Sequence, residues 1–295
     1  MASSRPRVGY LGPEGTFSEE ALLSSAGPEL VEPVPLGSIR ETVAALRECR
    51  VDWSIVPIEN SLEGSLGVTL DLIAGEPRDL EVVGEVLLRV SHSLIGPAAV
   101  ELERIETVTT HPQVPGQCAA FLRTELPGAR VLPSSSTAEA VRQVVAAGER
   151  SRAAIGTLLA ARIYGGTVLR EGVEDRGDNE TRFVWIARAG GASAPPLRAA
   201  GGGRKTSLVF WGPGADSPGW LVGCLDEFAR RGINLTKIES RTRRERLGSY
   251  MFFVDLEGDI GSGAVGDAVA GLAARCEEVR VLGSYPSGTP GARAE

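Results

Sequence analysis

Short apolar runs alternate with amphipathic stretches along the first 188 residues. The runs at 7–11, 53–58 and 82–90 have the length and composition of strands, and the patterns over 41–50 and 138–147 are those of helices. Further strands are expected at 107–110 and 153–156, and further helices at 114–126 and 157–164. Strands that alternate with helices predict an α/β region with a mostly parallel sheet.

Two of the predicted helices begin with the spacing of a capping box. Thr16 is followed three residues later by Glu19, and Ser136 by Glu139. Several strands therefore end in a polar cluster that also starts a helix. Convergent helix N-termini with free N–H groups would bind an anion without lysine, although most such ends in α/β proteins bind nothing.

The stretch 189–203 is rich in Gly, Ala and Pro and has no apolar period, which is typical of a linker. We therefore expect a first region at 1–188, a second at 204–285 and a tail at 286–295. The second region reads strand, helix, strand, strand, helix, strand, with Gly232 closing its first helix. This order predicts a ferredoxin-like βαββαβ fold.

Composition excludes several classes of function. The 295 residues suit about two domains, and a net charge of -7 argues against non-specific nucleic-acid binding. No apolar run approaches the roughly 20 residues of a membrane helix. The start of the chain lacks the apolar stretch of a secretory signal, so we expect a cytoplasmic protein.

Cofactor chemistry has few candidate residues. The four cysteines are scattered, and only His92 and His111 are histidines, which argues against a zinc or redox site. Only Lys205 and Lys237 are lysines, so a Schiff base in the first 200 residues is excluded. No Gly-rich phosphate loop occurs either. We expect neither a metal nor an organic cofactor.

The richest chemical signal is the run 178–184, where Thr181 and Arg182 lead into an apolar strand. Because strand side chains alternate, Thr181 and Phe183 share one face and Arg182 points to the other. A hydroxyl beside an aromatic ring suits a small polar ring compound. The alternative is an exposed strand end with a solvated arginine.

Together with this triplet, several motifs resemble the prephenate dehydratase family. The motifs are Gly-Tyr-Leu-Gly-Pro-Glu-Gly-Thr-Phe-Ser at 9–18, Val-Pro-Ile-Glu-Asn-Ser at 56–61, Thr-His-Pro-Gln at 110–113 with Gln-Cys at 117–118, and Thr-Arg-Phe at 181–183. The stretch 232–241 resembles that family's phenylalanine-sensing ACT domain. The resemblance implies conversion of prephenate to phenylpyruvate in phenylalanine biosynthesis, with loss of water and carbon dioxide. It also implies a two-lobed, periplasmic-binding-protein-like catalytic region with its site between the lobes.

The family assigns an essential role to the residue at Thr181 and cleft positions to Asn60, Thr110 and Gln117. Thr181 would polarise the departing hydroxyl, with a proton delivered by a neighbour or water. His111 suits general acid work, although it is equally suited to capping backbone, and His92 is expected to be structural. Arg182, Phe183, Glu59, Ser61 and Thr16 are expected to contact substrate, with Glu59 either orienting Asn60 or facing solvent. The firm anion contacts should hold the side-chain carboxylate of prephenate, because gripping the ring carboxylate would favour the ground state.

The resemblance places a phenylalanine effector in the second region, at Gly219, Leu221, Val222, Glu239, Ser240 and Arg241. Trp220 and Thr242 depart from the Ala and Pro usual there, which leaves the strength and sign of control open. Trp220 would either fill the effector pocket or close over its rim. Because ACT domains usually pair across subunits, a homodimer or homotetramer is expected.

Three alternatives remain from the sequence. Arogenate, the aminated analogue, is possible as substrate, and so is decarboxylation of prephenate without dehydration. The relatives that decarboxylate often lack the triplet's threonine and the ACT domain, and this chain has both. A non-catalytic amino-acid sensor is the third alternative, against which the intact Thr181, Asn60 and Gln117 argue.

Overall fold

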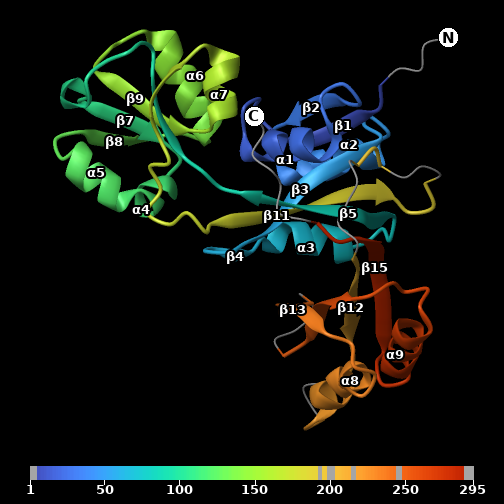
Figure 1. Ribbon diagram of the computed structural model, residues 1–295. Coiled ribbons are helices and arrows are strands. Elements are labelled where there is room, and N and C mark those ends of the chain that lie inside the picture. The colour runs from blue at the N-terminus through green and yellow to red at the C-terminus, as the bar shows by residue number, and fades with distance from the viewer. Residues whose placement is uncertain (1–4, 192–194, 198–202, 214–216, 244–247, 289–295) are drawn as a thin grey trace. The chain divides into compact units, whose positions relative to one another are not determined.

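The computed structural model describes residues 5–191, 195–197, 203–213, 217–243 and 248–288. Parts of the expected linker and of the expected tail lie outside the described residues. Figure 1 shows the elements in chain order. The helices are α1 (Phe17–Ala26), α2 (Ile39–Arg47), α3 (Gly67–Ala74), α4 (Val114–Gln117), α5 (Ala119–Glu125), α6 (Thr137–Ala147), α7 (Leu158–Tyr164), α8 (Trp220–Ala229) and α9 (Gly263–Ala273), with a 3-10 turn η1 (Leu102–Arg104).

The strands form three sheets. They are β1 (Arg7–Leu11), β2 (Glu32–Leu36), β3 (Trp53–Asn60), β4 (Gly64–Ser65), β5 (Leu80–Arg89), β6 (Ser93–Gly96), β7 (Thr107–Thr110), β8 (Arg130–Pro133), β9 (Arg152–Gly156), β10 (Thr167–Glu171), β11 (Glu180–Arg188), β12 (Arg204–Trp211), β13 (Leu235–Thr242), β14 (Tyr250–Glu257) and β15 (Glu278–Pro286).

The first sheet has the order β2-β1-β3-β11-β5, with β4 paired to β3. The second has the order β10-β6-β9-β7-β8. The parallel arrangement that we predicted is present in β2-β1-β3 and in β9-β7-β8. It is wrong at β6 and β10, which run antiparallel to their neighbours. Apolar side chains of the central strands, such as Val8, Ile55 and Ile155, are fully buried and form the cores.

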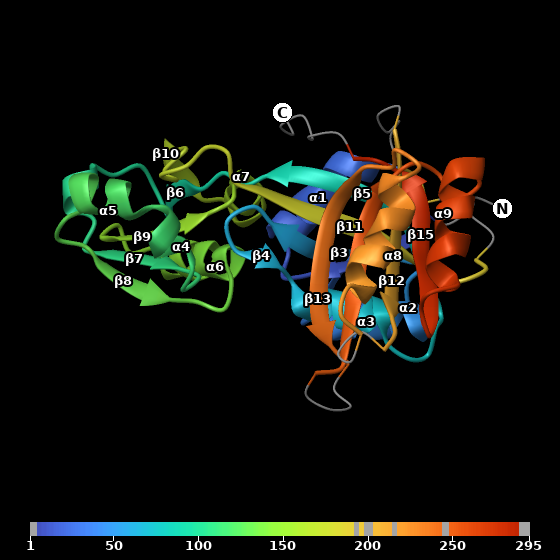
Figure 2. The same ribbon diagram turned by 90° about the horizontal axis from the view of Figure 1, so that it is seen from below.

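The third sheet, of order β13-β14-β12-β15, is antiparallel throughout. Helices α8 and α9 pack on it through Phe228 and Leu272, which join Leu208 and Val254 of the sheet in one core. Figure 2 shows both helices with β12, β13 and β15 of this sheet. The βαββαβ order and this pairing confirm the predicted ferredoxin-like domain.

The structure corrects two of the local predictions and confirms a third. Thr16 is the N-cap residue of α1, but its hydroxyl donates to Leu11 O (2.8 Å), and Glu19 accepts from Gly15 N instead, so the capping box is absent. Ser136 does cap α6, accepting from Glu139 N at 3.0 Å. The helix expected at 114–126 is broken into α4 and α5 at Cys118, whose ψ of 27° interrupts the turn.

Four elements had no clear pattern in the sequence. β2 contains two prolines and is tolerated because it lies at a sheet edge. β8 is an edge strand exposed along its whole length, and β10 is also an edge strand. α3 lacks a polar face, so it has no amphipathic period to detect.

The chain forms two compact units, which do not divide at the expected linker. One contains the residues up to Thr69 together with Val86–Phe183, and the other contains Leu70–Glu85 with the described part of 184–288. The second unit therefore includes most of α3 and half of β5, although both precede the linker in sequence.

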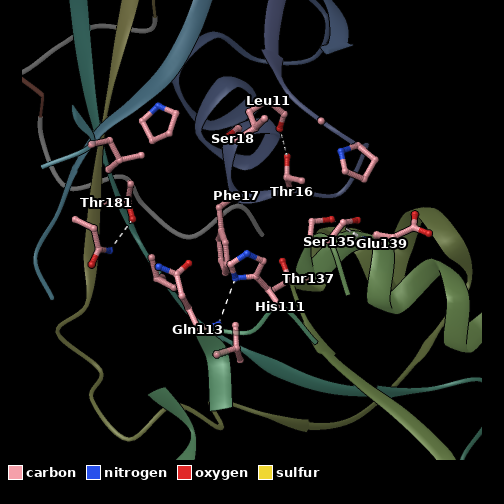
Figure 3. Close-up of a pocket in the computed structure, with 18 of the residues that line it drawn as sticks. Leu11, Thr16, Phe17, Ser18, His111, Gln113, Ser135, Thr137, Glu139 and Thr181 are labelled. Carbon is pink, nitrogen blue, oxygen red and sulfur yellow. Dashed lines mark hydrogen bonds between the residues drawn. The ribbon is translucent and has the colours of Figure 1, made fainter. Parts of the chain in front are cut away.

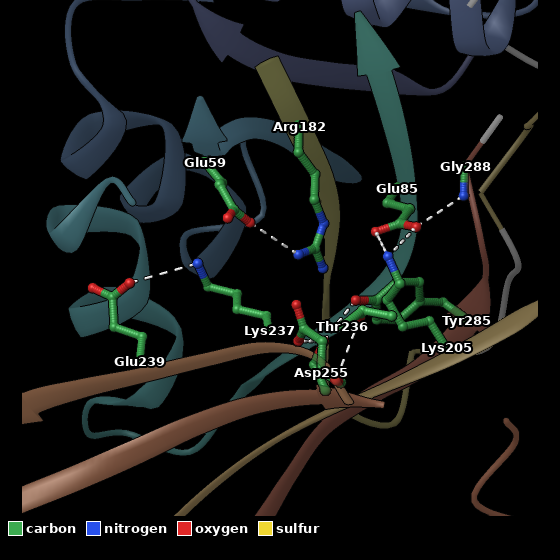
Figure 4. Close-up of polar contacts among 11 residues, drawn as sticks. Glu59, Glu85, Arg182, Lys205, Thr236, Lys237, Glu239, Asp255, Tyr285 and Gly288 are labelled. Carbon is green, nitrogen blue, oxygen red and sulfur yellow. Dashed lines mark hydrogen bonds and ion pairs between the residues drawn. The ribbon is translucent and has the colours of Figure 1, made fainter. Parts of the chain in front are cut away.

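Ion pairs connect these earlier segments to the ferredoxin-like domain within the second unit. Lys205 Nζ lies 2.8 and 3.0 Å from the two carboxylate oxygens of Glu85, whose side chain is 1% exposed and which also accepts from Gly288 N (Figure 4). The Arg241 guanidinium donates two bonds, of 2.7 and 3.0 Å, to Asp71 of α3. Arg280 donates to the carbonyls that end α3, a favourable position for a cation at a helix C-terminus.

Candidate active site

A pocket of about 780 Å³ lies within the first unit, between residues of its two sheets. Figure 3 shows polar side chains of its wall, such as Thr16, Ser135 and Thr181, together with the apolar Leu11 and Phe17. Of the residues expected at the site, six line it: Thr16, Asn60, His111, Gln117, Thr181 and Phe183. The pocket is also lined by Leu11, Phe17, Ser18, Pro35, Leu36, Pro57, Glu63, Leu66, Val90, His92, Gln113, Val114, Ser135, Ser136, Thr137, Glu139 and Asn179.

Asn60 and Thr181 form the most tightly defined pair in the pocket. They lie on adjacent strands, at the end of β3 and the start of β11. Asn60 Nδ2 donates to Thr181 Oγ1 at 2.9 Å and to Asn179 Oδ1 at 2.8 Å. Because the Thr181 oxygen accepts from the amide, its own proton is available for a ligand in the pocket.

The amide of Asn60 cannot turn over. Its Oδ1 accepts from the backbone N–H groups of Leu62 (2.9 Å) and Glu63 (3.0 Å), so the nitrogen must face Thr181. This bonding fixes the direction in which the Thr181 hydroxyl can donate.

His92, which was expected to have only a structural role, is also part of the pocket wall. Its Nε2 lies 3.0 Å from Gln117 Oε1, and Phe17 meets its ring edge-on at a centroid distance of 5.4 Å. Burial lowers the pKa of His92, so the imidazole is neutral near pH 7. The sequence signal for a pocket position was that His92 closely follows the long strand β5.

Four expected residues do not line the pocket. The Thr110 hydroxyl is fully buried and donates to Ile155 O at 2.8 Å. Arg182 points to the opposite face of β11, as alternation predicts, and its guanidinium lies 3.5 Å from Glu59 (Figure 4). The side chain of Ser61 bonds to the backbone, since its Oγ accepts from Glu180 N at 3.0 Å.

The donors that the pocket offers to an anion are neutral, because no Lys or Arg is among the described residues that line it. The starts of α1 and α6 both open on it, at 16–18 and 135–137. Since Thr16 makes no side-chain cap, the first N–H groups of α1 are not used by it. Within the described residues no cluster of His, Cys, Asp and Glu could hold a metal ion.

The residues expected to bind phenylalanine are spread over the ferredoxin-like domain. Gly219 has φ 81° and is the N-cap of α8, Leu221 packs against the domain core, and Val222 is 71% exposed. On β13, Glu239 lies 3.5 Å from Lys237, and Ser240 is in register with Phe252. Arg241 is engaged by Asp71, as described above.

Trp220 packs within its own domain, and its two expected roles at the effector pocket stay predictions. The indole packs against Phe210 and Phe252, with centroid distances of 6.0 Å to each, and its Nε1 donates to Arg275 O at 2.7 Å. The indole is partly buried against the core of its own domain, and its N–H has a carbonyl partner.

Fold and pocket define the class: a two-lobed α/β protein with a pocket between its two sheets, followed in the chain by a ferredoxin-like domain. The prephenate dehydratase family model matches residues 8–190. A curated prephenate dehydratase of Mycobacteroides abscessus is 42% identical over 290 residues, which cover 96% of this chain and 91% of the relative. The chain belongs to the prephenate dehydratase family, which confirms the resemblance seen in the motifs.

Two solved structures are similar over the whole chain. A prephenate dehydratase from Arthrobacter aurescens in complex with L-Phe is 35% identical, has a TM-score of 0.84, and is matched over 97% of this chain and 92% of its own. A protein described as GqqA, a quorum-quenching acylase, is 28% identical with a TM-score of 0.83, over 96% and 98%. The chain is thus a lyase of the kind that removes water and carbon dioxide. Among the described residues, no helix is long and apolar enough to cross a membrane.

Proposed function

We propose that the pocket of the first unit is the dehydratase site and that Thr181 acts on the departing hydroxyl of prephenate. The observation that carries this proposal is the fixed Asn60–Thr181 bond, which leaves the threonine proton for the substrate. In the reaction the bond to the ring carboxylate breaks, its electrons enter the ring, and the ring C–O bond breaks. The oxygen leaves as water after gaining one proton, and carbon dioxide is released.

The wall of the pocket separates the two carboxylates of the substrate. The N–H groups and hydroxyls at the starts of α1 and α6 hold the pyruvyl carboxylate. The ring carboxylate lies against apolar wall such as Leu36, Pro57 and Val114, where its negative charge is poorly solvated and its loss is favoured. Phe183 packs against the ring.

His111 supplies the proton that Thr181 cannot, because a threonine hydroxyl is far too weak an acid. His111 lies on the pocket wall, with Nδ1 at 3.5 Å from Gln113 N, the upper limit for a hydrogen bond. Its imidazole is therefore weakly held and can turn toward the substrate. Gln117 and Asn179 complete the set of neutral donors around the leaving oxygen.

The activity named for the acylase neighbour is not favoured by this site. An acylase of the nucleophilic type needs a base that takes the proton of the attacking hydroxyl. Here the contact to Thr181 Oγ1 is an amide donor, which lowers rather than raises the nucleophilicity of that oxygen.

The direct test incubates the full chain with prephenate and follows phenylpyruvate by its absorbance in alkali. Arogenate, assayed in parallel for release of phenylalanine, decides the substrate. We expect turnover of prephenate, because the curated relatives that this chain resembles are prephenate dehydratases. Faster turnover of arogenate would overturn the choice of substrate, and turnover of neither would overturn the site.

For the ferredoxin-like domain we infer feedback control by phenylalanine. The support is the L-Phe complex of the Arthrobacter relative, together with the Arg241–Asp71 pair, which ties β13 to α3. Helix α3 follows Leu66 of the pocket wall by one residue, so a ligand that moves β13 can act on the site through it. Calorimetry with phenylalanine tests this control, and an absence of binding at millimolar ligand would make the domain structural only.

We also propose that the enzyme works in the cytoplasm as a homodimer or homotetramer. β13 is an edge strand of its sheet, and Ile238 on it is 51% exposed, which suits pairing with a second copy. Light scattering of the purified chain decides the oligomeric state, and a monomer at micromolar concentration would contradict it.

A further inference from the structure

Glu63 lies in the tight turn between β3 and β4, beside the catalytic pair. The turn is held by Asn60 Oδ1, which accepts from the N–H groups of Leu62 and Glu63, and Gly64 closes it with φ 81°. Asn60 is the residue that donates to Thr181. The backbone at Glu63 is therefore fixed by the same amide that orients the catalytic hydroxyl.

The side chain of Glu63 crosses from the lobe of the first sheet to that of the second. Its two carboxylate oxygens accept separately from two glutamines at α4, Gln113 Nε2 at 2.5 Å and Gln117 Nε2 at 3.0 Å. These contacts join positions 50 and 54 residues apart in the chain. All three side chains line the pocket.

A carboxylate only accepts hydrogen bonds, so it fixes the orientation of both amides. Gln117 must turn its nitrogen to Glu63, which turns its Oε1 to His92 Nε2 at 3.0 Å. His92 must then carry its proton on Nε2 to make this bond. Its Nδ1 is left as a bare acceptor, buried and without a hydrogen-bond partner among the described residues.

We propose that Glu63 is a positioning residue for the reaction: it fixes the amide orientation of Gln117, and through it the tautomer of His92, while it holds the two lobes together across the pocket. The inference rests on the dehydratase site proposed above. Each glutamine nitrogen keeps a second N–H after bonding to Glu63, and that N–H is the donor offered to the anionic substrate. Without Glu63 the amide can turn over, which presents a carbonyl oxygen to a substrate oxygen.

A simple charge effect makes the opposite prediction. Prephenate is a dianion, so a carboxylate on the pocket wall repels it, and removal of the charge alone would lower KM. Glu139 provides the matched control, because its carboxylate also lines the pocket but is bonded to Arg142 and Gln143 of its own helix. Glu139→Gln removes one charge from the pocket wall and keeps the two hydrogen bonds from the glutamines to Glu63.

The kinetic test compares Glu63→Ala, Glu63→Gln and Glu139→Gln with the wild type. We expect Glu63→Ala to raise KM for prephenate about tenfold or more, because the variant loses the group that orients two hydrogen-bond donors. Glu63→Gln keeps one acceptor oxygen and should raise KM by a smaller factor, whereas Glu139→Gln should leave KM equal or lower. Equal decreases in KM for Glu63→Gln and Glu139→Gln would overturn the proposal in favour of charge alone.

A spectroscopic test is independent of activity. The chain has two histidines, so histidine labelled with 15N gives two ring systems, and His111→Asn assigns them. In the wild type His92 should show protonation at Nε2 only, and in Glu63→Ala a mixture of tautomers. Because Glu63 is exposed, the variants should fold, which circular dichroism checks. An unchanged His92 spectrum in Glu63→Ala would overturn the proposal. A wild-type chain that has no dehydratase activity but shows the expected His92 spectra would overturn only the proposed function.

Discussion

Replacing Thr181 with valine removes one oxygen from the pocket and keeps the shape of the side chain. In the wild type that oxygen accepts from Asn60 at 2.9 Å and leaves its proton for the departing hydroxyl. The hydroxyl gains negative charge as it leaves, so the donated bond strengthens in the transition state and contributes mainly to kcat.

The size of the effect follows from that one bond. Loss of a hydrogen-bond donor to a developing oxyanion costs about 2.7–4 kcal/mol, which corresponds to a decrease in kcat of about 10²–10³-fold. KM should change little, because the carboxylate contacts at α1 and α6 remain. Stability should fall by no more than about 1 kcal/mol, since Asn60 Nδ2 keeps Asn179 and Glu180 as acceptors.

The assay is the appearance of phenylpyruvate, with kcat and KM measured separately for each variant. Thr181→Ser is the matched control, because it restores the hydroxyl and loses only a methyl group, and it should recover most of kcat. Thermal unfolding establishes that each variant is folded. A folded Thr181→Val enzyme with full kcat would refute the role of the hydroxyl, and an increase in KM alone would reassign Thr181 to substrate binding.

Three further predictions concern stability and its dependence on pH. Trp220→Ala should destabilise the ferredoxin-like domain by about 3 kcal/mol and weaken the phenylalanine response, measured by unfolding and calorimetry; tighter binding would contradict a core role. Lys205→Met leaves the Glu85 carboxylate buried and should cost about 3–5 kcal/mol in urea unfolding, whereas adding Glu85→Leu should recover most of it; equal losses would contradict the buried pair. Burial lowers the pKa of His92, so below about pH 6.5 its imidazole takes up a proton in the unfolded chain and stays neutral in the folded chain. The contribution of His92 to the free energy of unfolding should therefore fall on acidification, by up to about 1.4 kcal/mol per pH unit. Burial raises the pKa of Glu20 to about 7, which acts in the opposite direction, so the measurement is the difference between wild type and His92→Asn; a difference independent of pH would contradict it.

The reach of sequence reasoning is clearest where the signal is local. The βαββαβ order could be predicted because each helix and strand carries its own period and its own end signals. Alternation along β11 placed Arg182 opposite Thr181 and Phe183, and the structure agrees. Edge strands such as β2 and β8 were not predicted, because an exposed strand needs no apolar alternation.

Contacts between distant residues depended on strand order, which no local pattern contains. Thr110 was expected at the site, yet its hydroxyl turns into the core because β7 lies beside β9. Cys224 and Cys276 lie far apart in the sequence, yet the packing of the domain brings their sulfurs to 3.8 Å, as free thiols.

The sequence by itself determined the family, the order of the elements and the chemical groups available for the reaction, because motifs and periodicity extend over only a few residues. The tertiary structure alone decided which of those groups meet. It paired Asn60 with Thr181 across 121 positions, and it placed Glu63 between two glutamines of the other lobe. Such pairs form because burying the apolar faces of the two sheets fixes where every strand ends, and the polar residues at those ends then find their partners.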